Sequence, residues 1–214
     1  MKVLIPLILL IITFSNCNKK CKITGGRYQF EISSTLFPAL DTFDLGDTIT
    51  IISEFNDQVY EAKTNRRYDL SNQTINHFLR IIKISCFPSN LKAISKFHIM
   101  SDSLLESQYL NFSSSESRVL IGDFSYFKGQ YSVKYKIIPL DTGLFLSSHG
   151  VIFYGQFPDQ CDDMENVFHV NLNNGHNNNI NMLQTSPDEH YNTWILKKPY
   201  DRFHSGGGYA FYVK

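Results

Sequence analysis

The segment Tyr131–Ile137 reads YSVKYKI and shows the clearest alternation of apolar and polar residues in the chain. Successive side chains of a β-strand point to opposite faces, so this pattern predicts a strand with one buried and one solvated face. The turn residues 141–143 (Asp-Thr-Gly) follow, and Leu144–Leu146 then predicts the second strand of a hairpin. These residues favour an antiparallel sheet as the basis of the fold.

Other short segments rich in β-branched, aromatic or alternating residues predict further strands on both sides of this hairpin. They are Arg27–Ile32, Thr48–Ile52, Arg67–Leu70, His77–Ser85, Ile94–Met100, Val151–Tyr154 and Tyr209–Val213. The polar, serine-rich segment Asp102–Ser117 predicts instead a long loop with at most one or two helical turns. We therefore expect a mainly β fold.

The composition is that of a folded chain without a strong charge. Hydrophobic residues make up 43% and aromatic residues 14% of the 214 residues, which is ample for a core and argues against disorder. Lysine and arginine number 20, and so do aspartate and glutamate. Because nucleic acids attract basic proteins, this balance gives no support for a nucleic-acid partner.

The first residues have the pattern of an export signal. Lys2 precedes the apolar run Val3–Ile12, and small polar residues lead to Cys17. The run is too short to span a bilayer, which takes about 20 apolar residues. A cysteine at the end of such a signal becomes the lipidated first residue when the signal is cleaved. We therefore predict a signal peptide over 1–16, lipidation of Cys17 and a short tether over 17–26.

The other cysteines are Cys21, Cys86 and Cys161. An exported protein can keep disulfides, and with Cys17 lipidated at most one intramolecular pair can form. A Cys86–Cys161 bond would connect distant parts of the body, whereas Cys21 could pair with either. Without lipidation the four cysteines allow three complete pairings, and buried free thiols are the remaining alternative.

The C-terminal region, 156–214, differs from the strand-rich part before it. Asn171–Asn181 is dominated by asparagine and predicts a loop that leads into a short helix. Ser186–Glu189 reads SPDE, in which serine can cap a helix, proline suits the first helical position and glutamate completes a capping box. The predicted helix runs to about Lys198. It places three bulky residues on one face, namely Tyr191, Trp194 and Ile195.

Histidines of this region are the first candidates for chemistry. Four of them, near two acidic residues, could form a metal site: His169, His176, His190 and His204. Their spacing matches no metal-binding motif, so surface or capping roles are the favoured interpretation and no metal or other cofactor is predicted.

Two further groups of residues are candidate sites. Cys161, His190 and Asn192 are the residue types of a cysteine hydrolase, but Asp162 and Asp163 beside the thiol would raise rather than lower its pKa. A structural role for Cys161 is favoured, and no catalytic residue is assigned.

The glycines at 206–208, with Arg202, His204 and Ser205, could hold an anion, although a flexible connector is the simpler interpretation. Trp194 could stack on a sugar, although packing in a core is more usual for such a stripe. The candidate ligand-binding residues are therefore His190, Trp194, Arg202 and His204.

Several stretches resemble known envelope proteins. Ser15–Lys20 (SNCNKK) is similar to the cleavage site and following residues of lipoproteins from Bacteroidetes-type bacteria. Tyr28–Phe30 and Asp41–Ile51 resemble the first strands of immunoglobulin-like envelope domains, in which a GDT turn introduces a core strand. Ser186–Tyr191 and Arg202–His204 fit the same group of uncharacterised lipoproteins. The resemblance implies location and architecture, not an activity.

Together these patterns predict an antiparallel immunoglobulin-like β-sandwich over 27–155, on which a small α+β portion over 156–214 docks and to which it returns its last strand. The expected function is a lipid-anchored protein of the bacterial cell envelope, at the outer membrane or cell surface. It would be a non-catalytic module that binds or scaffolds a protein or glycan partner. The alternative is a small envelope hydrolase that uses the histidines of the C-terminal portion.

Overall fold

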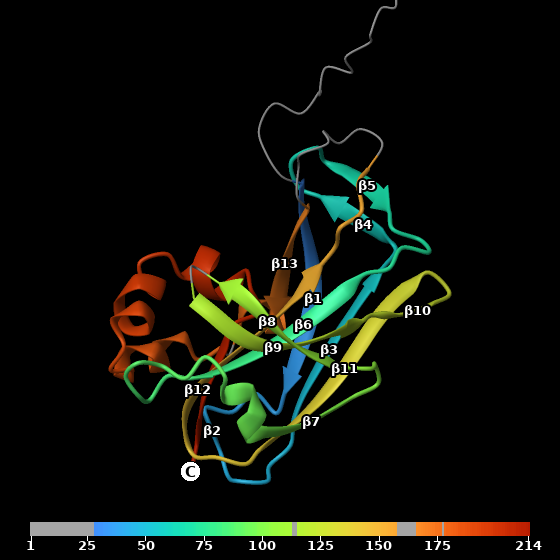
Figure 1. Ribbon diagram of the computed structural model, residues 1–214. Coiled ribbons are helices and arrows are strands. Elements are labelled where there is room, and N and C mark those ends of the chain that lie inside the picture. The colour runs from blue at the N-terminus through green and yellow to red at the C-terminus, as the bar shows by residue number, and fades with distance from the viewer. Residues whose placement is uncertain (1–27, 113–114, 158–165, 177) are drawn as a thin grey trace, which may run out of the picture.

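A computed structural model of the chain describes residues 28–112, 115–157, 166–176 and 178–214. The chain is mainly β, with two sheets and a group of short helical segments (Figure 1). The predicted signal peptide and tether, with Cys17 and Cys21, lie outside the described residues, as does Cys161. No helix within the described ranges has the length and apolar content that a membrane crossing needs.

The first sheet has eight strands around the segment that shows the clearest alternation. β11 (Gln130–Pro139) pairs along one edge with β3 (Ile49–Asn56), and β7 (Phe97–Ser101) and β10 (Ser125–Phe127) pair with it as well. Beyond β3 lie β1 (Tyr28–Phe37), β4 (Gln58–Glu61) and β5 (Arg66–Asp69). β13 (Asn166–Leu172) joins β1 in parallel.

The second sheet has six strands. Its order is β2 (Thr42–Phe43), β14 (Tyr209–Val213), β12 (Gly143–Ile152), β6 (Asn76–Lys83), β9 (Ser115–Asp123) and β8 (Glu106–Phe112). All neighbours in this sheet are antiparallel except β2 and β14. The expected return of the last strand to a sheet is therefore confirmed, since β14 pairs with β12.

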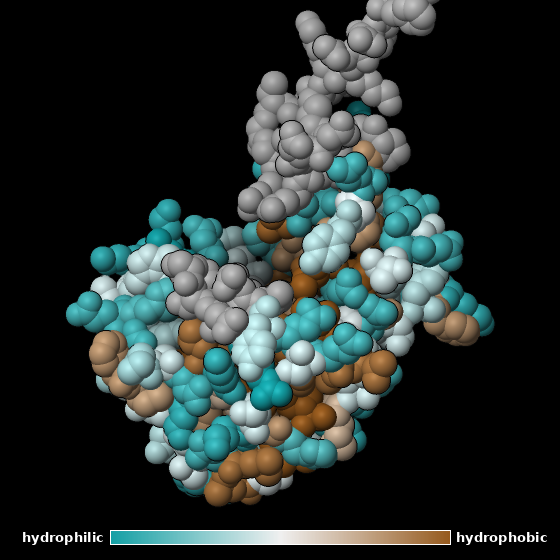
Figure 2. All heavy atoms as spheres, viewed as in Figure 1, coloured by the Kyte–Doolittle hydropathy of each residue, from teal (hydrophilic) through white to brown (hydrophobic). Residues whose placement is uncertain are grey.

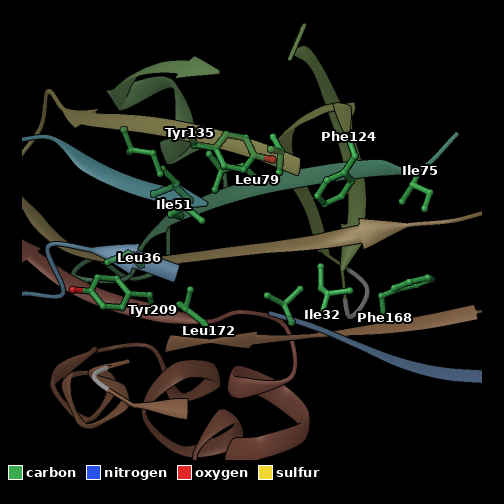
Figure 3. Packing of buried hydrophobic residues seen from close by; sticks show 14 of the residues in the cluster. Ile32, Leu36, Ile51, Ile75, Leu79, Phe124, Tyr135, Phe168, Leu172 and Tyr209 are labelled. Carbon is green, nitrogen blue, oxygen red and sulfur yellow. The ribbon is translucent and has the colours of Figure 1, made fainter. Parts of the chain in front are cut away.

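The main core lies between the two sheets. Side chains from both sheets enter it, among them Ile51 and Tyr135 of the first sheet and Leu79 and Tyr209 of the second (Figure 3). Burial of each large apolar side chain of this kind stabilises the fold by about 1.5–3 kcal/mol.

Short helical segments cover the opposite face of the second sheet. η3 (Ile180–Thr185), η4 (His190–Ile195) and η5 (Tyr200–His204) follow one another, and β14 leads back into the sheet. A second apolar cluster joins them to β6, β12 and β14, and its buried members are Ile82, Ile84, Leu144, Leu146, Leu183, Tyr191, Ile195, Phe203 and Ala210. The remaining segments, η1 (Ala93–Lys96) and η2 (Asn173–Gly175), are single 3-10 turns. The strands β6, β12 and β14 of the second sheet are thus buried on both faces.

The predicted hairpin between 131–137 and 144–146 is wrong, because its strands belong to different sheets. β11 already has partners along both of its edges. Gly143, at φ 130°, takes a backbone conformation that favours glycine, and there the chain passes into the second sheet. β12 then pairs with β6 and β14 instead.

The loop predicted over Asp102–Ser117 is also wrong, since much of it belongs to the β8–β9 pair. β8 is an edge strand, and its residues 106–109 are exposed. Such a strand buries few side chains, so it lacks the apolar alternation by which the other strands were recognised.

The helix predicted from Ser186 to about Lys198 is shorter and differently capped. Ser186 Oγ donates to the carbonyl of Ile84 in the sheet (2.7 Å) and accepts from the N–H of Asp188 (3.2 Å). Asp188 Oδ1 accepts from the N–H of His190 (3.0 Å), where the π-helical segment η4 begins. Ser186 therefore ties the loop to the sheet, and the helix begins at His190 instead of Pro187.

Candidate ligand-binding cavity

A cavity of about 510 Å³ lies between the outer face of the second sheet and the C-terminal helical segments. β6, β9 and β12 contribute to its lining, and so do the loop at 88–91 and residues of η4 and η5. Its volume is within the range of about 300–1,000 Å³ that is usual for small-molecule sites. It is therefore the first place to look for a ligand.

The strand β6 supplies the floor of the cavity. Alternation along this strand turns Phe78, Arg80 and Ile82 towards the cavity and Leu79 towards the main core. Arg80 Nε donates to the hydroxyl of Ser148 on the neighbouring strand β12 (3.1 Å). Burial lowers the pKa of the Arg80 guanidinium from its ordinary value, but arginine stays charged in proteins. A cation thus lies on an otherwise largely apolar sheet face.

A stack of three side chains forms one wall. The His190 ring lies nearly parallel to the Trp194 ring, with centroids 4.6 Å apart, because residues four apart share a helical face. The guanidinium carbon of Arg202, from η5, lies 3.6 Å from the centroid of the Trp194 ring. Arg202 Nη1 also donates to the Trp194 carbonyl. These contacts fix the position of the guanidinium, and a sugar could stack on Trp194 only by displacing one of the two partners.

Asp188 orders the loop at the mouth of the cavity. Its carboxylate accepts hydrogen bonds from the backbone N–H groups of Ser89 (3.2 Å) and His190 (3.0 Å). Burial raises the pKa of Asp188, but hydrogen bonds from Ser89 and His190 outweigh this effect and leave its pKa below the ordinary value. The carboxylate therefore stays ionised and joins the 88–91 loop to η4.

Electrostatic effects show that both arginines act on the same part of the cavity. Loss of hydration lowers the pKa of His190, Asp188 opposes this shift, and the charges of Arg80 and Arg202 lower it further. Burial also raises the pKa of Tyr191 to about 12, and Arg80 opposes that rise. Both guanidinium charges therefore lie near His190, and both arginines line the same cavity.

Three of the four predicted ligand-binding residues meet in this cavity: His190, Trp194 and Arg202. His204 does not join them, because it lines a second cavity of about 320 Å³ with His169 and Tyr200. Of the bulky stripe predicted on the helix, Tyr191 and Ile195 are buried in the second cluster, whereas Trp194 is 39% exposed at the cavity wall.

The other proposed chemistries gain no support from the described residues. No group of three or more histidine, cysteine, aspartate or glutamate side chains in those ranges could hold a metal. Cys161 lies outside them, so both the cysteine hydrolase and the Cys86–Cys161 disulfide stay predictions. Packing explains why a glycine stands at Gly208 in the cavity wall, because a Cβ there would lie 2.6 Å from the carbonyl oxygen of Phe203.

Sequence reasoning missed Arg80, the residue that gives the cavity its charge. The segment His77–Ser85 was predicted as a well-buried strand, and β6 confirms a strand there. An arginine within such an apolar run was the available signal, because charged side chains are seldom buried without a partner. Ser148 escaped notice because nothing in a sequence shows which strand lies beside β6.

No protein-family model matches this sequence, and no curated protein is detectably similar to it.

The surface away from the cavity offers a second, weaker feature. In the view of Figure 2 most of the surface is hydrophilic, and hydrophobic surface is visible between the hydrophilic areas and along the lower edge. Leu45 and Leu140 are 51% and 62% exposed, on loops that hydrogen bonds bring close to each other: Gly46 N–H donates to the Pro139 carbonyl (3.2 Å). Single exposed leucines are usual on protein surfaces, so this feature assigns no partner.

Proposed function

We propose that the protein is a lipid-anchored module of the bacterial cell envelope that binds a glycan in the cavity beside β6, without a catalytic step. The main support for this proposal is the cavity. It is a recess with the size of a small-molecule site, and cationic, anionic and hydroxyl groups alternate with apolar side chains around it. The immunoglobulin-like classification of the two-sheet body belongs to the same proposal, and the mainly antiparallel pairing of its strands supports it.

A glycan suits this recess better than a protein surface does. A sugar ring presents hydroxyl groups on all sides and apolar C–H faces between them, so it needs donors, acceptors and apolar contacts close together. The lining offers donors from Arg202, acceptors from Asp201 and an apolar contact from Phe203. A protein partner usually covers a broader and flatter area.

Replacement of Trp194 by alanine is expected to weaken glycan binding at least tenfold. The indole holds both His190 and Arg202 in place, so its removal disorders one whole wall of the cavity. The measurement is binding of the full-length protein to an array of neutral and acidic oligosaccharides, followed by titration calorimetry with the best ligand.

The matched control is Tyr154→Ala, since Tyr154 is 85% exposed and is not part of the cavity lining. This variant should bind as the native protein does. The proposal fails if no oligosaccharide binds, or if Trp194→Ala binds as tightly as Tyr154→Ala. A protein partner captured through the surface around Leu140 would then become the better interpretation.

The proposed lipid anchor has its own test. In cells given labelled palmitate, the native chain should incorporate the label and Cys17→Ala should not. Lipid attachment confines the protein to a membrane face, where even a weak glycan site gains from a high local concentration. Cys86→Ala serves as the control and should incorporate label normally. Equal labelling of native chain and Cys17→Ala would remove the anchor from the proposal without touching the cavity.

A further inference from the structure

The two arginines of the cavity distinguish it from a site for neutral sugars. Arg80 lies at the floor and Arg202 at the wall, on opposite layers of the molecule: β6 belongs to the sheet and η5 to the helical segments. A guanidinium presents its N–H donors in a planar fork that matches the two oxygens of a carboxylate.

Both guanidinium groups are held in place before any ligand arrives. Arg80 is positioned by its bond to Ser148, which lies directly opposite it on β12. Arg202 is positioned by its stack on Trp194 and its bond to the carbonyl of that residue. Side chains that are already ordered lose little entropy on binding, so their contacts add more to affinity.

The acidic groups of the cavity do not remove this preference. Asp188 is occupied by the N–H groups of Ser89 and His190. Asp201 is exposed at the rim, where its carboxylate can accept hydrogen bonds from hydroxyl groups. The floor of the cavity, where Arg80 lies, is therefore cationic, and hydrogen bonds between charged groups are stronger in such surroundings than in bulk water.

We propose that the sugar bound in this cavity carries a carboxylate, as a uronic acid does, and that Arg80 and Arg202 bind this carboxylate together. This inference rests on the proposed glycan-binding function and adds the chemical class of the sugar. The hydroxyl groups of the sugar would then lie towards Asp201 and the mouth, and its apolar face towards Phe203.

The test is titration calorimetry of the full-length protein with a short oligouronide and with the same oligosaccharide after reduction of its carboxyl groups. The oligouronide should bind at least tenfold more tightly, and its affinity should fall as salt rises. Arg202→Gln should reduce this preference without abolishing it. Arg80→Gln should abolish it. Arg67→Gln, which removes an exposed arginine outside the cavity, should leave binding unchanged.

Each outcome separates the inference from the function on which it rests. If the two oligosaccharides bind equally well to the native protein and neither binds to Trp194→Ala, the carboxylate inference fails but the glycan site is retained. Absence of binding to either would overturn both. If acetate at the same concentration displaces the oligouronide, the cavity is a simple anion site and the inference that it recognises a sugar fails. Arg202 lies near the surface, so Arg202→Gln is expected to fold even if Arg80→Gln does not. If Arg202→Gln keeps the full preference for the oligouronide, the proposal is overturned.

Discussion

Acidification from about pH 7 to pH 4 is expected to lower the free energy of unfolding by roughly 6 kcal/mol, since two histidines are buried uncharged. The two residues are His77 on β6 and His149 on β12, which are 1% and 3% exposed. Both side chains point between the sheets. The pKa of each is lowered from 6.5 to about 4.

The two histidines resist protonation for related reasons. Burial is the largest cause for His77, and the charges of Asp102 and Asp123 oppose it. Its ring nitrogens already have partners in Tyr135 Oη and Ser103 Oγ. For His149 burial again comes first, followed by the charge of His77. A hydrogen bond with the backbone of Gly207 opposes these two effects but is outweighed by them.

The direction of the effect follows from which state binds protons. Above pH 6.5 the histidines are neutral in both states and contribute no pH dependence. Between 6.5 and about 4 the unfolded chain binds protons that the folded chain does not, so stability falls as pH falls. Below about 4 the folded state also binds them and the loss levels off. A shift of this size corresponds to about 3 kcal/mol for each histidine.

The measurement is urea unfolding of the full-length protein across this pH range. His149→Met replaces the ring by an apolar side chain and should halve the loss on acidification. His176→Gln is the control: His176 is exposed, so this change should leave the profile of the native protein intact. A native protein whose stability stays constant from pH 7 to pH 4 would contradict the prediction.

Phe30→Ala is expected to destabilise the protein by about 3–5 kcal/mol, because it leaves a cavity at the centre of an aromatic cluster. Phe30 is fully buried on β1 and pairs across to Phe168 of β13, with ring centroids 4.8 Å apart. The ring centroids of Phe157 and Tyr68 lie 5.5 and 5.9 Å from the ring centroid of Phe30. Rings around the missing side chain cannot collapse without breaking their contacts with one another.

Thermal and urea unfolding of Phe30→Ala measure this loss. Phe127→Ala is the matched control, since Phe127 is 71% exposed on β10, and it should change stability by no more than about 0.5 kcal/mol. A loss at Phe30 as small as that at Phe127 would mean that the aromatic cluster does not hold β1 and β13 together.

Sequence patterns were sufficient wherever a strand buries one face. Tyr131–Ile137 and Tyr209–Val213 lie wholly within strands, and Thr48–Ile52 does so from Ile49 onwards, because alternation and β-branched residues reflect burial directly. Three of the four candidate ligand-binding residues also proved to be neighbours, since two lie on one helical turn and Arg202 follows closely in the chain. Local spacing predicts proximity of this kind.

The sequence by itself determined that the chain is mainly β and which side chains of its clearest strands are apolar. Only the tertiary structure decided which strands are neighbours: β11 and β12 lie in different sheets, β8 is an edge strand, and β13 joins β1 from far along the chain. Alternation states which face of a strand is buried but not what covers it. The cavity depends on this second fact, because Arg80 lines a cavity only where η4 and η5 cover β6, and its hydrogen bond to Ser148 needs β12 beside it.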